Sequence, residues 1–430
     1  MKMWAWALGV LLMVAGCAPN GVGGDSLDEI AKDYVQMQLE IGEREPGYID
    51  AYYGPAEWQA AAKAAPRSLG DLSEAAEGLA QRTRGINDDG LDRMAQRRRA
   101  FLLAQLTAAQ IRLRMLQGEK LSFADEAEGL FAVRPELKPL SAYDPLLARI
   151  ETLVPGTGAL SDRVDAFQNR FTIPKNRLEP VFRAAIDECK RRTAEHVSLP
   201  PKENFTLEFV TGKSWSGYNW YKGNATSLIQ VNTDLPIRLS RAVDLGCHEG
   251  YPGHHVYNML LEQELAKKRG WAEFTVYPLY SPQSLIAEGS ANYGIELAFP
   301  GPERLRYETE ALYPLAGLDP AAAPQYLALQ EALQELAGAR FTIARDYLEG
   351  RITREQAIEL TRKYQLVSRA RAEQSIAFTD QYRSYVINYG LGQDMVRAHV
   401  EAAGEDPEAR WARMAKILSE PTLPMDLSPR

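Results

Sequence analysis

Hydrophobic residues recur every three to four positions over most of the chain, which is the spacing of an amphipathic helix. This pattern covers Asp25 to Gly42, where an Asp-Ser pair suited to capping precedes the first apolar position. It returns at Leu91 to Gln117 and over nearly everything from Gln325 to Arg397. Inside the last stretch, Thr353 and Gln356 have the spacing of a capping box that opens a further helix. The pattern therefore predicts a mainly helical protein.

Strand patterns are confined to the middle of the chain. Phe205 to Gly212 and Ser227 to Asp234 alternate or cluster β-forming residues between turn residues. They flank an aromatic loop, KSWSGYNWYKGN. The aromatic side chains of this loop line a cleft or form a small separate core; they are Trp215, Tyr218, Trp220 and Tyr221. We expect a small β-sheet within a large helical body.

The chain has 430 residues, of which 45% are hydrophobic, so it can build a substantial core. No internal repeat and no linker stands out. We predict one helical domain over residues 27–430, and a division near Pro155–Pro200 is the alternative.

Charge excludes one class of partner. The chain carries 49 Lys and Arg against 57 Asp and Glu, a formal net charge of −8, with both signs mixed along its length. No basic stripe is present, so we expect no nucleic-acid partner. The densest basic run, Gln96 to Phe101, lies on a predicted amphipathic helix, and we interpret it as a solvated face.

The N-terminus predicts export. Lys2 precedes an apolar run of signal-peptide length, which ends in Val-Ala-Gly followed by Cys17 and resembles a bacterial lipobox. This implies a lipoprotein signal peptide over residues 1–16, lipidation of Cys17 and a Gly-rich tether over residues 17–26. Ala18 favours the outer membrane, on its periplasmic side, if the cell is Gram-negative. An ordinary secretory signal is the alternative.

Two further cysteines, Cys189 and Cys247, would then lie in an oxidising compartment. They either pair or remain two buried free thiols, and the sequence does not decide between these.

The segment CHEGYPGHHVY carries the candidate chemistry. Of the five histidines of the chain, three fall between positions 248 and 255, and Glu249 follows the first of them. Histidine is a common metal ligand, and an adjacent carboxylate can take a proton from metal-activated water. The pattern differs from HExxH, whose second histidine comes four residues after the first. Here the later histidines are His254 and His255, six and seven residues after His248.

On a straight helix, positions six and seven residues on lie about 9 and about 10.5 Å along the axis, too far to share one ion. The sequence supplies a break. Pro252 cannot donate the helical hydrogen bond back to His248, and Gly253 tolerates unusual backbone angles. We predict a helix from about Pro236 through Glu249 that kinks or bulges at this step and returns a later histidine to the ion.

A third protein ligand is expected from a following helix. Ser281 to Phe299 begins with Ser-Pro and contains Glu288, which we predict as this ligand, with Glu296 as the fallback. Asn292 lies one turn after Glu288 and Asp244 one turn before His248. Each is a candidate to orient a ligand from outside the metal's direct contacts.

HEGYPGHH, followed about thirty residues later by AEGSANYGIEL, resembles the bacterial family known as domain of unknown function 885. DAYYGP near the N-terminus, YVINYGLG and LSEPTLPMDL are also similar to that family, so the resemblance spans nearly the whole mature chain. It implies a largely helical metallopeptidase of the HExxH type, with His248, one of the paired histidines and Glu288 as ligands and Glu249 as the base. Ser290 departs from the tryptophan common in the family.

His254 needs the smaller insertion relative to HExxH, and we prefer it to His255, which then orients a ligand, contacts substrate or is the alternative ligand. Peptide hydrolysis also needs a donor that stabilises the oxyanion. DQYRSYVINYGLG offers several, and we predict Tyr385 and Tyr389, one helical turn apart. The strand Ser227 to Asp234 is either the edge strand that pairs with substrate or an ordinary structural strand.

The first hypothesis is therefore a lipid-anchored hydrolase that binds Zn²⁺ and cleaves peptides of the cell envelope. One alternative is a non-catalytic envelope lipoprotein with a relic site or a closed structural metal site that includes Cys247 or His255. The other is a zinc hydrolase that cleaves esters or non-peptide amides of a small molecule.

Overall fold

The computed structural model describes residues 26–428. The predicted signal peptide, lipobox and lipidated Cys17 lie outside these residues. Within them the chain is mainly helical with two small sheets, as the hydrophobic pattern predicts. Ser26 and Glu29 form a capping box at the first helix, and Thr353 and Gln356 form the predicted one at α16 (Arg354–Gln365).

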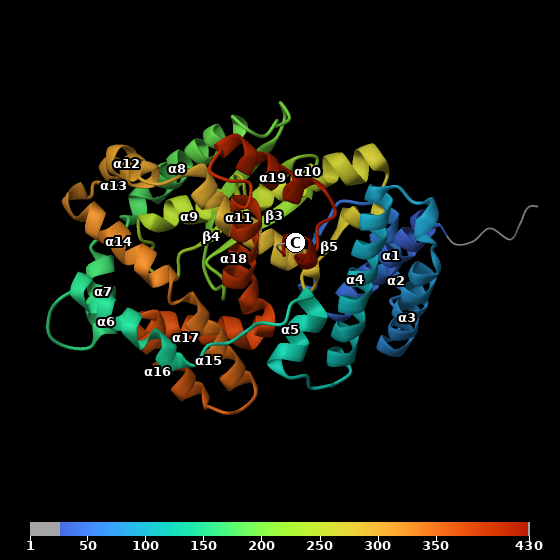
Figure 1. Cartoon of the computed structure of the whole chain (residues 1–430), viewed down its shortest axis with the longest axis horizontal. Helices are drawn as coiled ribbons and strands as arrows, with labels where there is room; N and C mark the ends of the chain where they lie inside the picture. Colours follow the sequence, from blue (N-terminus) through green and yellow to red (C-terminus); the bar gives the residue numbers. More distant parts are fainter. Residues whose placement is uncertain (1–25, 429–430) are drawn as a thin grey trace, which may run out of the picture.

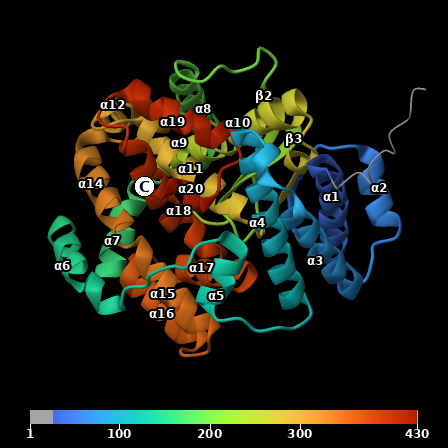
Figure 2. The same cartoon turned by 45° about the vertical axis from the view of Figure 1, so that its right-hand side comes forward.

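Five helices form the N-terminal part of the structure, which lies on the right in Figures 1 and 2 apart from α5. They are α1 (Leu27–Arg44), α2 (Ala56–Ala64), α3 (Leu69–Gly85), α4 (Arg93–Leu116) and α5 (Phe123–Phe131). The buried face of α1 carries apolar side chains at helical spacing and packs against α2 and α3. Burial of this face stabilises the group, since short helices are marginal alone.

A three-stranded sheet lies near the centre of the molecule. Its strands are β2 (Asn204–Val210), β3 (Gly217–Gly223) and β4 (Thr226–Asn232), in the order β2-β4-β3. The β2–β4 pair is parallel and the β3–β4 pair is antiparallel. A second, two-stranded antiparallel sheet joins β1 (Ile49–Tyr52) to β5 (Val276–Pro278).

The remaining helices are α6 (Asp144–Leu153), α7 (Leu160–Asn169), α8 (Leu178–Ala194), α9 (Ser240–Glu249), α10 (His254–Leu261), α11 (Pro282–Ala298), α12 (Glu303–Tyr307), α13 (Tyr313–Ala316), α14 (Ala323–Gln334), α15 (Ala337–Leu348), α16 (Arg354–Gln365), α17 (Arg369–Tyr382), α18 (Ile387–Glu401), α19 (Pro407–Ser419) and α20 (Pro424–Leu427). Of these helices, α9 and α10 contact the three-stranded sheet directly. Helices α6, α7 and α14 lie on the side opposite α1 to α3 (Figures 1 and 2). Helix α11 packs against both α9 and α18 in the interior.

One continuous cluster of buried apolar side chains extends from Leu27 to Leu427 and includes residues on both sides of Pro155–Pro200. Among the described residues, no helix is both long and apolar enough to cross a membrane.

Two sequence interpretations of the middle and the N-terminal part are wrong. The aromatic segment is not a loop throughout, because residues 217–223 form strand β3. The basic run is not simply a solvated face. Arg98 is 4% exposed, and its guanidinium pairs with both oxygens of the Glu273 carboxylate, at 2.6 and 3.0 Å. Glu273 is itself buried and lies 175 residues further along the chain, so no local pattern indicates the pair.

Cys189 of α8 and Cys247 of α9 form a disulfide with a sequence separation of 58 residues. Closing a loop of this length stabilises the folded state by about 4 kcal/mol in the chain-entropy model.

We expect the double variant Cys189→Ala/Cys247→Ala to lose about 2–4 kcal/mol in the free energy of unfolding, measured by denaturant titration. A reducing agent should destabilise the wild type and leave the double variant unchanged. A wild type that is insensitive to reduction would contradict the role of this bond.

Candidate functional site

The imidazole rings of His248 and His254, which precede and follow the Pro252-Gly253 step, lie next to each other. Helix α9 ends at Glu249, the backbone turns through Gly250–Gly253, and α10 begins at His254. The helix is therefore interrupted by a turn rather than bulged, and it begins at Ser240 rather than near Pro236. Across this turn, Nε2 of His248 lies 3.1 Å from Nε2 of His254. The break after α9 therefore brings together two imidazoles that would be too far apart on a straight helix.

Glycine is required inside the turn. A Cβ atom at Gly253 would lie 1.8 Å from the His248 carbonyl oxygen and 2.5 Å from the Cys247 carbonyl oxygen. The Gly253 N–H donates to that Cys247 carbonyl at 3.1 Å. The chain thus folds back directly onto the last turn of α9, which brings α10 close enough for His254 to face His248.

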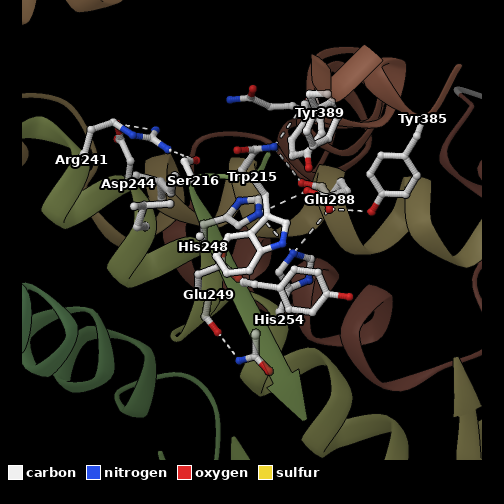
Figure 3. A pocket seen from close by; sticks show the side chains of 18 of the residues that line it. Trp215, Ser216, Arg241, Asp244, His248, Glu249, His254, Glu288, Tyr385 and Tyr389 are labelled. Atoms are coloured by element: carbon white, nitrogen blue, oxygen red, sulfur yellow. Dashed lines mark hydrogen bonds and ion pairs between the residues drawn. The ribbon is translucent and has the colours of Figure 1, made fainter. Parts of the chain in front are cut away.

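Glu288 of α11 completes the cluster (Figure 3). Its Oε2 atom lies 3.2 Å from Nε2 of His248, and its Oε1 atom lies 3.7 Å from Nε2 of His254. One ligand atom from each of the three residues can be chosen so that all lie within 4.8 Å of one another. The described residues form one group of this kind with at least three His, Cys, Asp or Glu side chains.

The spacing of these donors fits one metal ion. Two nitrogens at 2.0–2.1 Å from a tetrahedral zinc are about 3.3 Å apart, close to the 3.1 Å between the two imidazoles. The Oε2 atom of Glu288 is buried and accepts no hydrogen bond of suitable geometry, although His248 is near. A buried carboxylate oxygen without a hydrogen-bond donor needs another positive partner.

The electrostatics of His254 and Glu288 agree with this donor set, whereas for His248 the neighbouring Glu288 and Glu249 outweigh burial and raise the pKa. Burial lowers the pKa of the His254 imidazole to about 4, so the ring is neutral at pH 7, the form that binds metal. Burial acts to raise the pKa of Glu288, but the two histidines and Tyr385 outweigh it and lower the pKa. Glu288 is therefore an ionised carboxylate between two imidazoles.

Glu249 lies beside the cluster and is 4% exposed. Burial raises the pKa of its carboxyl group to about 7, which suits a group that accepts and returns protons near neutral pH. Asn219 of β3 donates a hydrogen bond to the Glu249 backbone carbonyl at 2.6 Å. Strand β3 therefore positions this end of α9.

Gly217 of β3 makes room for the Glu249 carboxylate. A Cβ atom at position 217 would lie 2.7 Å from Oε1 of Glu249 and 2.7 Å from a methyl group of Leu245. We expect Gly217→Ala to displace the carboxylate and to slow any reaction in which Glu249 transfers a proton roughly ten- to hundredfold, since a misplacement of about 1 Å can have effects of this size. The metal content should stay unchanged.

The matched control is Gly78→Ala in α3, where a Cβ atom meets nothing within 4 Å. Both variants are to be compared by kcat/KM and thermal unfolding. Equal activity of Gly217→Ala and the wild type would contradict the positioning role of this glycine.

The two predicted tyrosines lie next to Glu288 (Figure 3). The Tyr385 hydroxyl donates to Oε1 of Glu288 at 2.8 Å, so it holds the carboxylate in place. The ring of Tyr389 stacks on His248, with 6.4 Å between ring centroids. Its hydroxyl makes no hydrogen bond to any described residue, which leaves Tyr389 free to donate to a substrate.

Helices α11 and α18 approach closely behind the cluster. A Cβ atom at Gly289 would lie 2.5 Å from the Gly392 backbone, so the two glycines let these helices touch. Asn292 donates to the backbone carbonyls of Glu288 at 3.0 Å and of Tyr389 at 3.3 Å. Asn292 thus joins one helix to the other, and its hydrogen bonds go to backbone carbonyls rather than to a ligand side chain, which differs from the predicted orienting role.

The structure does not place three other predicted residues at the cluster. His255 is fully buried and faces away, with Nδ1 2.8 Å from Ser227 and Nε2 3.0 Å from Glu203. Asp244 pairs with Arg304 at 2.8 Å rather than with His248. Glu296, the fallback ligand, pairs with Arg397. A closed metal site that includes His255 or Cys247 is also contradicted, because Cys247 is in the disulfide.

A cavity of about 570 Å³ opens onto the cluster, within the size range of small-ligand and cofactor sites. All the residues of the cluster line it, together with Trp215 and Tyr218 of the aromatic segment. Tyr221 does not; it is buried and its hydroxyl donates to Glu262. The aromatic segment thus lines the cavity with one end and packs in the core with the other.

Sequence reasoning missed three features of this cavity: Asp50 in β1, the edge strand β3 and Arg340 in α15. Burial raises the pKa of Asp50 to about 7, and its carboxylate accepts a hydrogen bond from Tyr218. Asp50 belongs to the DAYYGP segment, so the family resemblance of this segment is a signal from which Asp50 could have been found. Nothing in the sequence around Arg340 distinguishes it from other helical arginines.

The fold is similar to that of known proteins, whereas the sequence is not. No family model and no curated protein matches the chain. The crystal structure of a candidate lipoprotein from Colwellia psychrerythraea superposes with a TM-score of 0.52 at 16% identity, covering 84% of this chain and 68% of that one. This similarity defines a shared fold.

Two further structures align over most of their length with scores too low to define a shared fold. One is a candidate lipoprotein of unknown function from Shewanella oneidensis, with a TM-score of 0.41 at 14% identity, covering 93% of this chain and 81% of that one. The other is an M32 carboxypeptidase from Deinococcus radiodurans R1, with a TM-score of 0.39 at 14% identity, covering 91% of this chain and 88% of that one. The family resemblance therefore stays a prediction.

Proposed function

We propose that this protein is a zinc-dependent hydrolase that cleaves peptides. The observation that carries the proposal is the convergence of His248, His254 and Glu288 on one point at the wall of a cavity, with the buried Glu249 beside them. Two imidazoles and one carboxylate are a donor set of catalytic zinc sites, which keep one position open. The resemblance to domain of unknown function 885 agrees with this assignment.

The residues divide the chemistry among them. His248, His254 and Glu288 would hold the ion, which when bound polarises a water molecule and the substrate carbonyl. Glu249 takes the proton of the attacking water and delivers it to the departing amine nitrogen. The Tyr389 hydroxyl donates to the oxygen that becomes negatively charged, and Tyr385 keeps Glu288 oriented.

Strand β3 supports a peptide as the substrate. The Asn232 N–H donates to the Ser216 carbonyl, and the antiparallel register continues from Gly217↔Val231. In such a ladder the hydrogen-bonded pairs alternate, so the backbone groups of Gly217 and Asn219 point away from β4. Both residues line the cavity, where an extended peptide can pair with them.

Of the two interpretations of Ser227 to Asp234, the ordinary structural strand is correct, because β4 is central in the sheet and paired on both sides. Strands β2 and β3 are the two edge strands, and β3 is the one whose residues line the cavity.

We also propose that the protein is anchored in the cell envelope through lipid on Cys17, as the lipobox indicates. Replacing Cys17 with alanine should move the protein from the membrane fraction to the soluble fraction. Unchanged fractionation would contradict the anchor.

The test of the proposed function combines metal analysis with hydrolysis. Protein purified without chelator should contain about one zinc per chain and should cleave members of a mixed peptide library, followed by mass spectrometry. Removing the metal with a chelator should stop cleavage, and adding zinc should restore it. A protein that contains no metal, or that cleaves no peptide with zinc bound, would contradict the proposal.

A further inference from the structure

Arg340 of α15 lines the cavity without an anionic partner. Among residues 26–428, no carboxylate lies within ion-pair distance of its guanidinium, and no group accepts a hydrogen bond from its Nε atom, which is buried. The contacts of the guanidinium are with two aromatic rings, at 5.0 Å from the Phe378 centroid and 5.9 Å from the Tyr389 centroid. A guanidinium has five N–H donors, and a partly buried one without an anionic partner can bind an anionic group of a ligand.

The other arginines of the cavity already have partners. Arg304 pairs with Asp244 and with Glu308, and Arg241 also contacts Asp244. Arg371 donates to the Pro236 carbonyl at 2.6 Å. Arg371 also lacks a carboxylate partner, but Arg340 is the cavity arginine whose guanidinium has no hydrogen-bond acceptor among the described residues.

The position of Arg340 relates it to the cluster through one shared neighbour. Its guanidinium lies 5.9 Å from the Tyr389 ring, and that ring lies 6.4 Å from the His248 ring. The distance from the Arg340 guanidinium to the centroid of the His248 ring is therefore at most the sum of these two distances. An extended peptide spans about 3.3–3.6 Å per residue, so a group within about three residues of the cleaved bond can reach it.

We propose that Arg340 binds a carboxylate of the substrate, at most about three residues from the bond that is cleaved. Guanidinium and carboxylate form two parallel hydrogen bonds, which gives both affinity and orientation. The carboxylate is the C-terminus of the peptide or an acidic side chain near the cleaved bond. This inference rests on the proposed function and specifies its substrate class as anionic peptides.

The test measures binding rather than cleavage, so that it is independent of hydrolysis. The probes are acetylated trialanine with a free C-terminal carboxylate, the same peptide as its amide, and an amidated acetyl peptide in which glutamate replaces the last alanine. Calorimetry with the metal-loaded Glu249→Gln protein should show that the free acid or the glutamate peptide binds roughly ten- to a hundredfold more tightly than the trialanine amide, as for a hydrogen bond to a charged group.

Adding Arg340→Met should remove this preference, and adding Arg340→Lys should retain part of it. The matched control is Arg345→Met on the same helix, whose guanidinium pairs with the adjacent Asp346. Preference for the free acid identifies the terminal carboxylate, and preference for the glutamate peptide identifies a side chain. Equal binding of all three peptides, no binding of any, or a preference that survives in Arg340→Met would overturn the inference. Binding through Arg340 without hydrolysis of any peptide would refute the proposed function alone.

Discussion

Replacing Glu249 with glutamine is expected to lower kcat by about 10²–10⁴, the contribution of a general acid–base group, while the protein keeps its metal. Glutamine has nearly the same shape, but its amide cannot take a proton from water. Because Glu249 lies beside the cluster and belongs to no group of candidate ligands, the donor set stays complete. Rates on a cleaved peptide and metal content are to be measured on the same preparation.

Glu208→Gln is the control, since Glu208 lies on β2 and its side chain accepts a hydrogen bond from Gln230 at the exposed face of the sheet. It should retain wild-type activity. A Glu249→Gln protein that holds zinc and cleaves peptides at the wild-type rate would rule out Glu249 as the base.

Alanine substitutions at the two adjacent histidines should have opposite consequences. His254→Ala removes a nitrogen that lies 3.1 Å from His248, and we expect zinc affinity to fall by more than about a hundredfold with little loss of stability. His255→Ala should keep the metal. It leaves Ser227 without its buried partner and removes one hydrogen bond of Glu203, which keeps those to Tyr251 and Lys190, so we expect a loss of about 1–3 kcal/mol in the free energy of unfolding.

Competition with a chromophoric chelator gives the zinc affinity, and denaturant titration gives the stability. The reverse outcome, in which His255→Ala loses zinc and His254→Ala keeps it, would mean that the turn after α9 has a different geometry in solution.

Local signals predicted the parts of the fold that depend on neighbouring residues. The capping boxes at Ser26 and Thr353 formed because each is completed within three residues. The break after α9 was also predictable, because Pro252 and Gly253 determine the backbone conformation of the turn in which they lie. What the sequence left open was whether His254 or His255 faces His248, because that depends on how the turn folds back.

Contacts between distant segments account for the wrong or missing predictions. Strand β4 is central because β2 pairs with one side and β3 with the other, and strand order is a property of the assembled sheet. Arg98 is buried because Glu273 lies opposite it. Asp244 pairs with Arg304 and His255 pairs with Glu203. Both of these partners lie in distant segments of the chain.

The same limit applies to the cavity. Gly217 matters because the Glu249 carboxylate fills the space where a side chain would be. Arg340 is notable because no carboxylate among the described residues approaches it, which a sequence cannot indicate. The candidate ligands and the two tyrosines had a sequence signal, whereas Gly217 and Arg340 did not.

The most direct measurement is X-ray diffraction from crystals grown without chelator, recorded just above and just below the zinc absorption edge. We predict one anomalous peak, present above the edge and absent below it, at about 2.0–2.2 Å from Nε2 of His248, Nε2 of His254 and an oxygen of Glu288. No peak at these three side chains, or a peak beside His255 and Glu203 instead, would contradict the account.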